Sequence, residues 1–134
     1  MIPGIELLYQ RIADAMIATL PDGGWSSAEF HSLFYPDSST YEAEYVRPNG
    51  TAASFLPASD GDRAVRELRR LFGQAGQPVW GQVRFRLRPD GSFDVWWGYE
   101  GCDASGDLRF DEATESRRHE ERRRRLIAGR PREA

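Results

Sequence analysis

Two stretches with the periodicity of a β-strand flank the tripeptide Pro89-Asp90-Gly91, and they constrain the fold more than any other part of the chain. Apolar and polar residues alternate from 83 to 88 and again from 93 to 100, as in strands that bury one face. Proline suits the first central position of a type I turn, and glycine suits the left-handed position that follows it. The tripeptide is therefore predicted to be the three-residue loop of a β-hairpin.

A loop of this length sets the register of the hairpin. Arg88 faces Ser92, and the apolar residues of both strands then lie on one face of the sheet. The predicted apolar pairs are Leu87 with Phe93, Phe85 with Val95, and Val83 with Trp97. The predicted pairs on the opposite face are Arg86 with Asp94 and Arg84 with Trp96. A two-residue turn at Asp90-Gly91 would place Leu87 opposite Asp94 and mix the two faces, so we reject it.

The composition is that of one folded domain. A chain of 134 residues buries about two thirds of its unfolded surface, which is enough for a single core. Hydrophobic residues make up 40% of the chain and aromatic residues 12%, too many for a disordered protein. The first residues show neither a basic start nor an unbroken apolar run, and Cys102 is the single cysteine. We therefore expect a cytoplasmic protein with no membrane span and no internal disulfide.

Arginine supplies all 18 basic residues, so a Schiff-base lysine, a lysine general base and a Walker lysine are excluded. The charge is unevenly distributed along the chain. Residues 1–110 hold 10 arginines and 15 acids, whereas residues 111–134 hold 8 arginines and 6 acids. Phosphate binding favours a basic surface, so the acidic body argues against nucleic acid as a direct partner.

Other periodicities place the remaining elements. The predicted first helix has apolar residues at helical spacing and ends at a turn over 21–24; these residues are Ile5, Leu8, Ile12 and Ala15. Residues 25–35 and 40–47 are predicted strands. The turn Pro48-Asn49-Gly50 that follows them resembles Pro89-Asp90-Gly91. A second helix is predicted over about residues 60–74, opened by a capping box of Ser59 and Asp62.

Together these elements predict a single α+β domain. The expected order is helix, three strands, helix, two-strand hairpin and C-terminal helix, with an antiparallel sheet of about five strands. Residues 1–112 are the predicted domain, and residues 113–134 are a charged, arginine-rich C-terminal helix or tail of the same domain. In that tail, Glu120 precedes Arg124 by four residues, a spacing that stabilises helices.

A nucleophilic site at Cys102 is disfavoured. His31 or His119 could act as its base. The neighbouring acids Glu100 and Asp103 would raise the pKa of the thiol, however, and a reactive thiolate needs the opposite. Two histidines without cysteine partners also make a poor zinc site.

A calcium loop is suggested by Asp103, Ser105 and Asp107, whose spacing resembles the start of an EF-hand. The pattern then fails, because the sixth position is Leu108 instead of glycine and the twelfth is Thr114 instead of glutamate. We therefore predict no catalytic residue, no metal site and no cofactor, and a protein that is not an enzyme.

An acidic arc with aromatic neighbours is the strongest candidate for a binding surface, because a binder of a basic partner presents acids beside aromatic anchors. The predicted partner-binding residues are Asp94, Trp96, Tyr99, Glu100, Asp103, Asp107, Asp111 and Glu112. Glu42 and Glu44 are the second choice. These acids could also serve only to keep a small domain soluble. The arginine-rich tail could bind nucleic acid, although its interleaved acids favour a solvated helix.

Several short motifs follow one another along these elements. They are Glu6–Ala13 in the first helix, Tyr41–Tyr45, Pro78-Val79-Trp80, Asp90–Phe93, Trp97, Tyr99 and Asp103. Over about residues 5–112 this arrangement resembles the YezG-like immunity proteins, the antitoxins of bacterial polymorphic toxin systems. The chain departs from that pattern in its exclusive use of arginine and in its longer charged tail.

The resemblance implies a cytoplasmic protein that binds the C-terminal domain of a cognate toxin. Such toxins are often nucleases or act on nucleotides or NAD, and the immunity protein would occlude the active-site cleft without catalysis, cofactor or membrane contact. The alternative is a small nucleic-acid-binding or adaptor protein that uses the arginine-rich C-terminal helix. A third possibility is a small enzyme that depends on Cys102 and loses its activity in Cys102→Ala.

Overall fold

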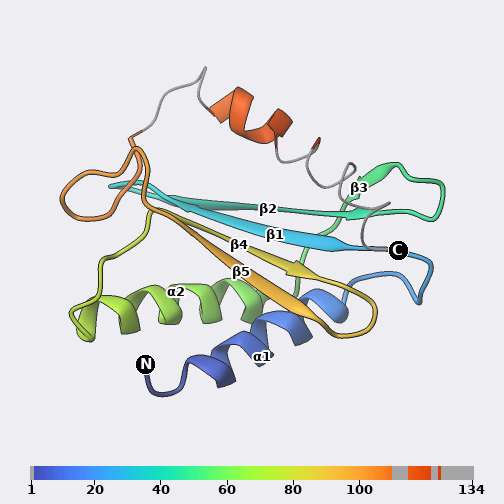
Figure 1. Ribbon diagram of the computed structural model, residues 1–134, viewed down its shortest axis with the longest axis horizontal. Coiled ribbons are helices and arrows are strands. Elements are labelled where there is room, and N and C mark those ends of the chain that lie inside the picture. The colour runs from blue at the N-terminus through green and yellow to red at the C-terminus, as the bar shows by residue number, and fades with distance from the viewer. Residues whose placement is uncertain (1, 110–114, 122–123, 125–134) are drawn as a thin grey trace.

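The computed structural model describes residues 2–109, 115–121 and 124, and it confirms the predicted α+β class and order of elements (Figure 1). Helix α1 spans Ile5–Ile17 and helix α2 spans Ser59–Gln74. The strands are β1 (Ala28–Phe34), β2 (Ser39–Val46), β3 (Ala52–Ser54), β4 (Gln82–Leu87) and β5 (Phe93–Gly98). Residues 115–121 and 124 are helical, as predicted for the C-terminal part of the chain.

The sheet separates two layers. Its strand order is β3-β2-β1-β4-β5, and every neighbouring pair is antiparallel. Helices α1 and α2 lie side by side against one face, and the helical segment 115–121 lies over the other (Figure 1). In the described part of the chain, no helix combines the length and the apolar composition that a membrane span requires.

The β4–β5 hairpin has the predicted register. The observed pairs are Leu87 with Phe93, Arg86 with Asp94, Phe85 with Val95, Arg84 with Trp96, and Val83 with Trp97. Arg88 donates its amide to the carbonyl oxygen of Ser92 at 3.0 Å, and Gly91 donates to that of Arg88 at 2.9 Å. The φ of Gly91 is 88°, the left-handed conformation expected of a glycine at this position. The loop chemistry therefore does determine which residues of the hairpin face the core.

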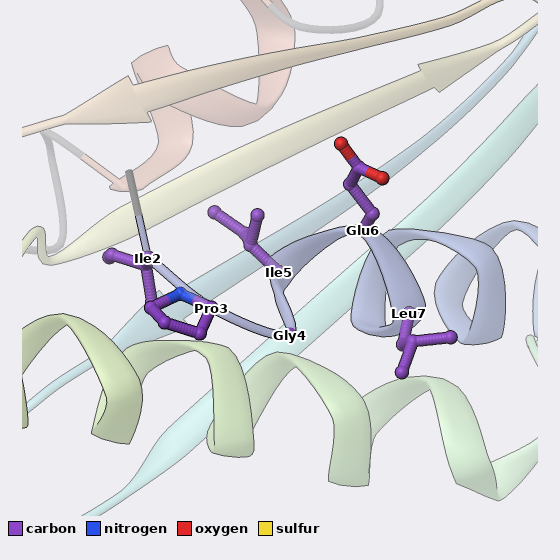
Figure 2. A pocket seen from close by; sticks show the side chains of 6 residues that line it. All are labelled: Ile2, Pro3, Gly4, Ile5, Glu6 and Leu7. Carbon is purple, nitrogen blue, oxygen red and sulfur yellow. The ribbon is translucent and has the colours of Figure 1, made fainter.

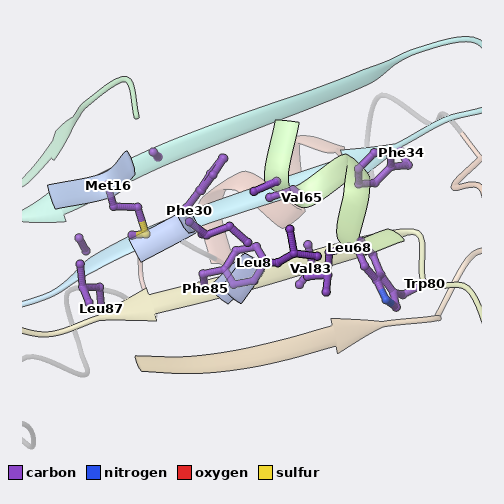
Figure 3. Packing of buried hydrophobic residues seen from close by; sticks show 14 of the residues in the cluster. Leu8, Met16, Phe30, Phe34, Val65, Leu68, Trp80, Val83, Phe85 and Leu87 are labelled. Atoms are coloured by element: carbon purple, nitrogen blue, oxygen red, sulfur yellow. The ribbon is translucent and has the colours of Figure 1, made fainter. Parts of the chain in front are cut away.

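The core lies between the sheet and the two helices (Figure 3). Its largest fully buried side chains include Trp80, Phe30 and Phe85. The apolar residues of β5 point to this core as expected, but they are only partly buried, because β5 forms one edge of the described sheet. The ring of Trp97 nevertheless lies 4.9 Å from that of Phe72 and 5.2 Å from that of Trp80.

The predicted capping box at the start of α2 is wrong. The N-cap residue is Ala58, and no side chain caps the helix. Asp62 instead binds Arg66 at 2.9 Å within the helix. The amide of Ala58 donates to the carbonyl oxygen of Ala15 at 3.0 Å, so packing against α1 fixes the start of α2. A Cβ on Gly61 would lie 3.0 Å from the Cβ of Ala15, which shows how closely the two helices approach.

Candidate functional site

The sheet face that points away from α1 and α2 is polar. Strand alternation places on it Glu29 and His31 of β1, Glu42 and Glu44 of β2, Gln82, Arg84 and Arg86 of β4, and Asp94 and Trp96 of β5. Acids therefore occupy the β1–β2 half, and arginines occupy β4. All seven residues of β1 are buried, so both faces of that strand are covered.

Two carboxylates on this face are buried. Glu29 and Glu44 are register partners, and each is only 2% exposed. Glu29 is also opposite Arg86, an arrangement that compensates buried charge across neighbouring strands. Glu44, a predicted partner-binding residue, is thus not displayed on the surface. Glu42 is half-exposed, and its carboxylate lies 3.3 Å from Nδ1 of His119 in the helical segment.

Two acids of the predicted arc hold the loop after β5 together. One oxygen of Asp103 accepts the amides of Ser105 and Asp107, at 2.9 and 3.0 Å. Arg69 of α2 donates to the carboxylate of Asp107 at 2.9 Å and to the carbonyl oxygen of Gly106 at 2.8 Å. Asp103 and Asp107 are therefore engaged in loop structure. In the part of the chain that the structure describes, no three His, Cys, Asp or Glu side chains are grouped as metal ligands.

Four predicted residues remain displayed on β5 and the turn that follows it, and we call Asp94, Trp96, Tyr99 and Glu100 the edge patch. Trp96 and Tyr99 are each 46% exposed, a large fraction for aromatic side chains. The side chain of Asp94 is 67% exposed and lies 2.9 Å from Arg88. Glu100 is exposed as well. The last two members of the predicted arc, Asp111 and Glu112, lie outside the described residues.

Trp96 is held in place by a neighbouring strand. The guanidinium carbon of Arg84 lies 3.6 Å from the centre of the Trp96 ring, a close cation–π contact. The pairing of Arg84 with Trp96 in the hairpin register brings the two side chains together. The side chain of Trp96 is therefore ordered in the unbound protein.

A polar cavity of about 550 Å³ lies between the sheet and the helical segment, and we call it the sheet–helix cavity. Its floor consists of side chains from the polar sheet face, namely His31, Gln82, Arg84 and Trp96. Arg117, Arg118 and Glu121 of the helical segment line its other side, and Glu100 and Gly101 lie at the turn after β5. The cavity and the edge patch thus share Trp96 and Glu100.

Cys102 lacks the surroundings of a nucleophile. Burial raises the pKa of its thiol above the ordinary value, which disfavours the thiolate. The two histidines are engaged elsewhere. Nε2 of His31 lies 2.8 Å from the side-chain oxygen of Gln82, and His119 contacts Glu42. Both histidines therefore have polar partners other than the thiol.

A second hollow, at the start of α1, has different chemistry. It has a volume of about 360 Å³ and is lined by one continuous segment, residues 2–7. Figure 2 shows its side chains, of which Glu6 is the single charged one. Binding pockets usually bring several polar groups together from different elements. This hollow has no such convergence.

The basic side of the cavity does not follow from the sequence alone. Alternation places Arg84 on the polar face of the hairpin, and Arg118 falls within the predicted charged C-terminal helix. The signal available in the sequence was the row of three alternating arginines at 84, 86 and 88. That row shows which face the arginines share, but it does not show that residues 115–121 lie over it.

The comparisons with known proteins assign no family. No family model matches the chain, and no curated protein matches it either. A function for this protein is therefore proposed from the chemistry of its surface.

Proposed function

We propose that the protein is an immunity protein, which binds a toxin domain in the cytoplasm and occludes its active-site cleft. The observation that carries this proposal is the edge patch, in which two exposed aromatic side chains and two exposed carboxylates lie along β5 and the turn that follows it. Aromatic anchors among charges are typical of protein–protein binding sites. The resemblance to immunity proteins supports the same conclusion.

A binding role agrees with the chemistry of the described residues. Burial raises the pKa of the Cys102 thiol, and the histidines contact Gln82 and Glu42. These groups are arranged for structure, and the exposed acids are arranged for contact. A toxin that acts on nucleic acid or a dinucleotide has a basic cleft, to which Asp94 and Glu100 are complementary in charge.

The mechanism is steric and electrostatic. The carboxylates of Asp94 and Glu100 would accelerate association with a basic cleft. Trp96, held by Arg84, would supply a rigid apolar contact that slows dissociation. Because Trp96 is already ordered, little side-chain entropy is lost when the complex forms.

Co-expression with the C-terminal domain of a large secreted protein encoded by the adjacent gene tests the proposal. The protein should protect cells from that domain and form a stable complex with it. The double reversal Asp94→Arg and Glu100→Arg should slow association about 10-fold or more at low salt, and Trp96→Ala should accelerate dissociation. Glu6→Arg is the matched control, because this exposed acid belongs to α1 on the other side of the sheet.

Full protection by both edge-patch variants would exclude the edge patch as the main contact. Failure of the wild-type protein to protect against any adjacent toxin domain would refute the immunity function. Steeply salt-dependent binding to DNA or RNA in place of a toxin would favour the nucleic-acid alternative.

A further inference from the structure

The sheet–helix cavity has a floor of buried polar groups. His31 is 1% exposed and Gln82 is 7% exposed, and their side chains are 2.8 Å apart. Buried polar groups of this kind are costly unless they are hydrogen-bonded, so they do not accumulate by chance. The floor is therefore a rigid polar surface at the base of an open space of about 550 Å³.

Guanidinium groups line the cavity on two sides. Arg84 reaches it from β4, and Arg117 and Arg118 reach it from the helical segment. Arg84 is fixed by its stack on Trp96 at 3.6 Å, which uses the face of the guanidinium. Arg118 is fixed by Glu115 at 2.6 Å, and its side chain is only 19% exposed. Such pre-ordered arginines bind anions with little loss of entropy.

The charge of the lining favours an anion. Among the described residues that line the cavity there are three arginines and two glutamates, so these residues together have a formal charge of +1 with histidine neutral. Glu100 belongs to the turn after β5 and Glu121 to the helical segment. Neither is part of the floor that Gln82 and His31 form. A ligand that satisfies all these groups carries an anionic end for the arginines and hydroxyl groups for the carboxylates.

We propose that the sheet–helix cavity binds a phosphate ester that carries a sugar and a planar ring, of the size of a nucleoside monophosphate. The volume lies within the range of about 300–1,000 Å³ that small-molecule sites occupy. Guanidinium groups match phosphate oxygens in pairs, and the indole of Trp96 offers a flat surface for a ring. Glu100 and Glu121 accept hydrogen bonds from the sugar hydroxyls. This proposal is argued from the lining of the cavity and does not require the immunity function, although Trp96 and Glu100 belong to both sites.

Calorimetric titration of the full-length protein tests the site, with AMP, ribose 5-phosphate, inorganic phosphate and adenosine as probes. AMP should bind saturably, and ribose 5-phosphate and phosphate should bind more weakly in that order. Arg84→Gln should weaken AMP binding about 10-fold or more, because a charge-assisted contact is lost. Arg63→Gln is the control, since Arg63 is an exposed arginine of α2 in the opposite layer, and it should leave binding unchanged.

Trp96→Ala tests the contribution of the planar ring to binding separately from that of the phosphate. It should weaken AMP binding more than phosphate binding, because it removes the surface for the ring and also the stack that holds the guanidinium of Arg84. Arg118→Gln removes a different guanidinium from the cavity. It keeps the test decisive if circular dichroism shows that Arg84→Gln does not fold. Equal AMP affinity in the wild-type protein and in the folded arginine variants would overturn the proposal. Absence of saturable AMP binding up to about 10 mM, or binding of adenosine as tight as that of AMP, would overturn it as well.

Discussion

Replacement of Arg69 by alanine should destabilise the protein more than replacement of any exposed arginine of the same helix. Arg69 projects from α2 and donates to three acceptors. These are the carbonyl oxygen of Trp80 at 3.0 Å, the carbonyl oxygen of Gly106 at 2.8 Å and the carboxylate of Asp107 at 2.9 Å. Its guanidinium also lies 4.6 Å from the centre of the Phe34 ring. One side chain therefore connects α2 to the segment that leads into β4 and to the loop after β5.

The expected loss follows from the burial of these groups. The side chains of Arg69 and Asp107 are 19% and 20% exposed, so water does not readily replace the lost donor. Hydrogen bonds to charged groups contribute about 1.5–3 kcal/mol each, and bonds that share one donor are not additive. We expect Arg69→Ala to lower the free energy of unfolding by about 3–5 kcal/mol, within the range for a broken buried ion pair. The melting temperature should fall by roughly 10–20 °C.

Urea unfolding followed by tryptophan fluorescence measures this loss. Arg63→Ala is the matched control, because its side chain is 67% exposed and its contact to Asp60 is 3.7 Å long. Such surface pairs contribute about 0–1 kcal/mol. Arg69→Lys should recover little stability, since an ammonium cannot reach the three acceptors as a planar guanidinium does. A loss below about 1 kcal/mol in Arg69→Ala would refute the conclusion that this residue anchors the loop.

Three further comparisons between variants test the fold. Trp97→Ala should cost about 2–4 kcal/mol by urea unfolding, whereas Trp96→Ala should cost less than about 1 kcal/mol, and equal losses would mean that the faces of β5 are misassigned. Gly106→Ala should lower the melting temperature more than Gly91→Ala. Both glycines have a positive φ, so both substitutions strain the backbone. A Cβ at Gly106 would also lie 2.6 Å from a backbone carbonyl oxygen, whereas a Cβ at Gly91 would meet open space. Burial, and then a hydrogen bond to a glutamate, raise the pKa of Tyr35 above its ordinary value, so its stabilising contribution is present at neutral pH and is lost as the pH rises above about 10. The stability difference between the wild-type protein and Tyr35→Phe should therefore be constant up to about pH 9 and shrink as the pH rises above about 10, and a difference that stays constant up to about pH 11 would contradict the assignment.

Local chemistry explains why the hairpin was predictable. The loop Pro89-Asp90-Gly91 restricts the backbone within three residues, and the register of the adjoining strands follows from it. Once the register is set, strand alternation points Phe85 and Arg84 toward opposite faces of the sheet. The edge patch was predictable for the same reason, because Asp94 and Trp96 lie on the polar face of that hairpin.

Contacts between distant parts of the chain explain what was not predictable. Arg69 binds a loop 37 and 38 residues further along the chain, and no local period in the sequence indicates this. Alternation placed Glu44 on the polar face of β2, but alternation does not show that this face is covered. The capping box failed similarly, since packing against Ala15 and not a side-chain cap fixes the start of α2.

The two proposed binding sites cannot act independently, because Trp96 and Glu100 belong to both the edge patch and the sheet–helix cavity. A toxin domain that covers Trp96 removes the wall on which the ring of a nucleotide would lie. A nucleotide whose sugar hydroxyls bind Glu100 likewise occupies a carboxylate that would otherwise contact a basic cleft. Linkage requires that each ligand change the affinity of the other by the same factor. Shared contacts make that coupling unfavourable, so an occupied cavity would weaken toxin binding, and a bound toxin would weaken nucleotide binding to the same extent.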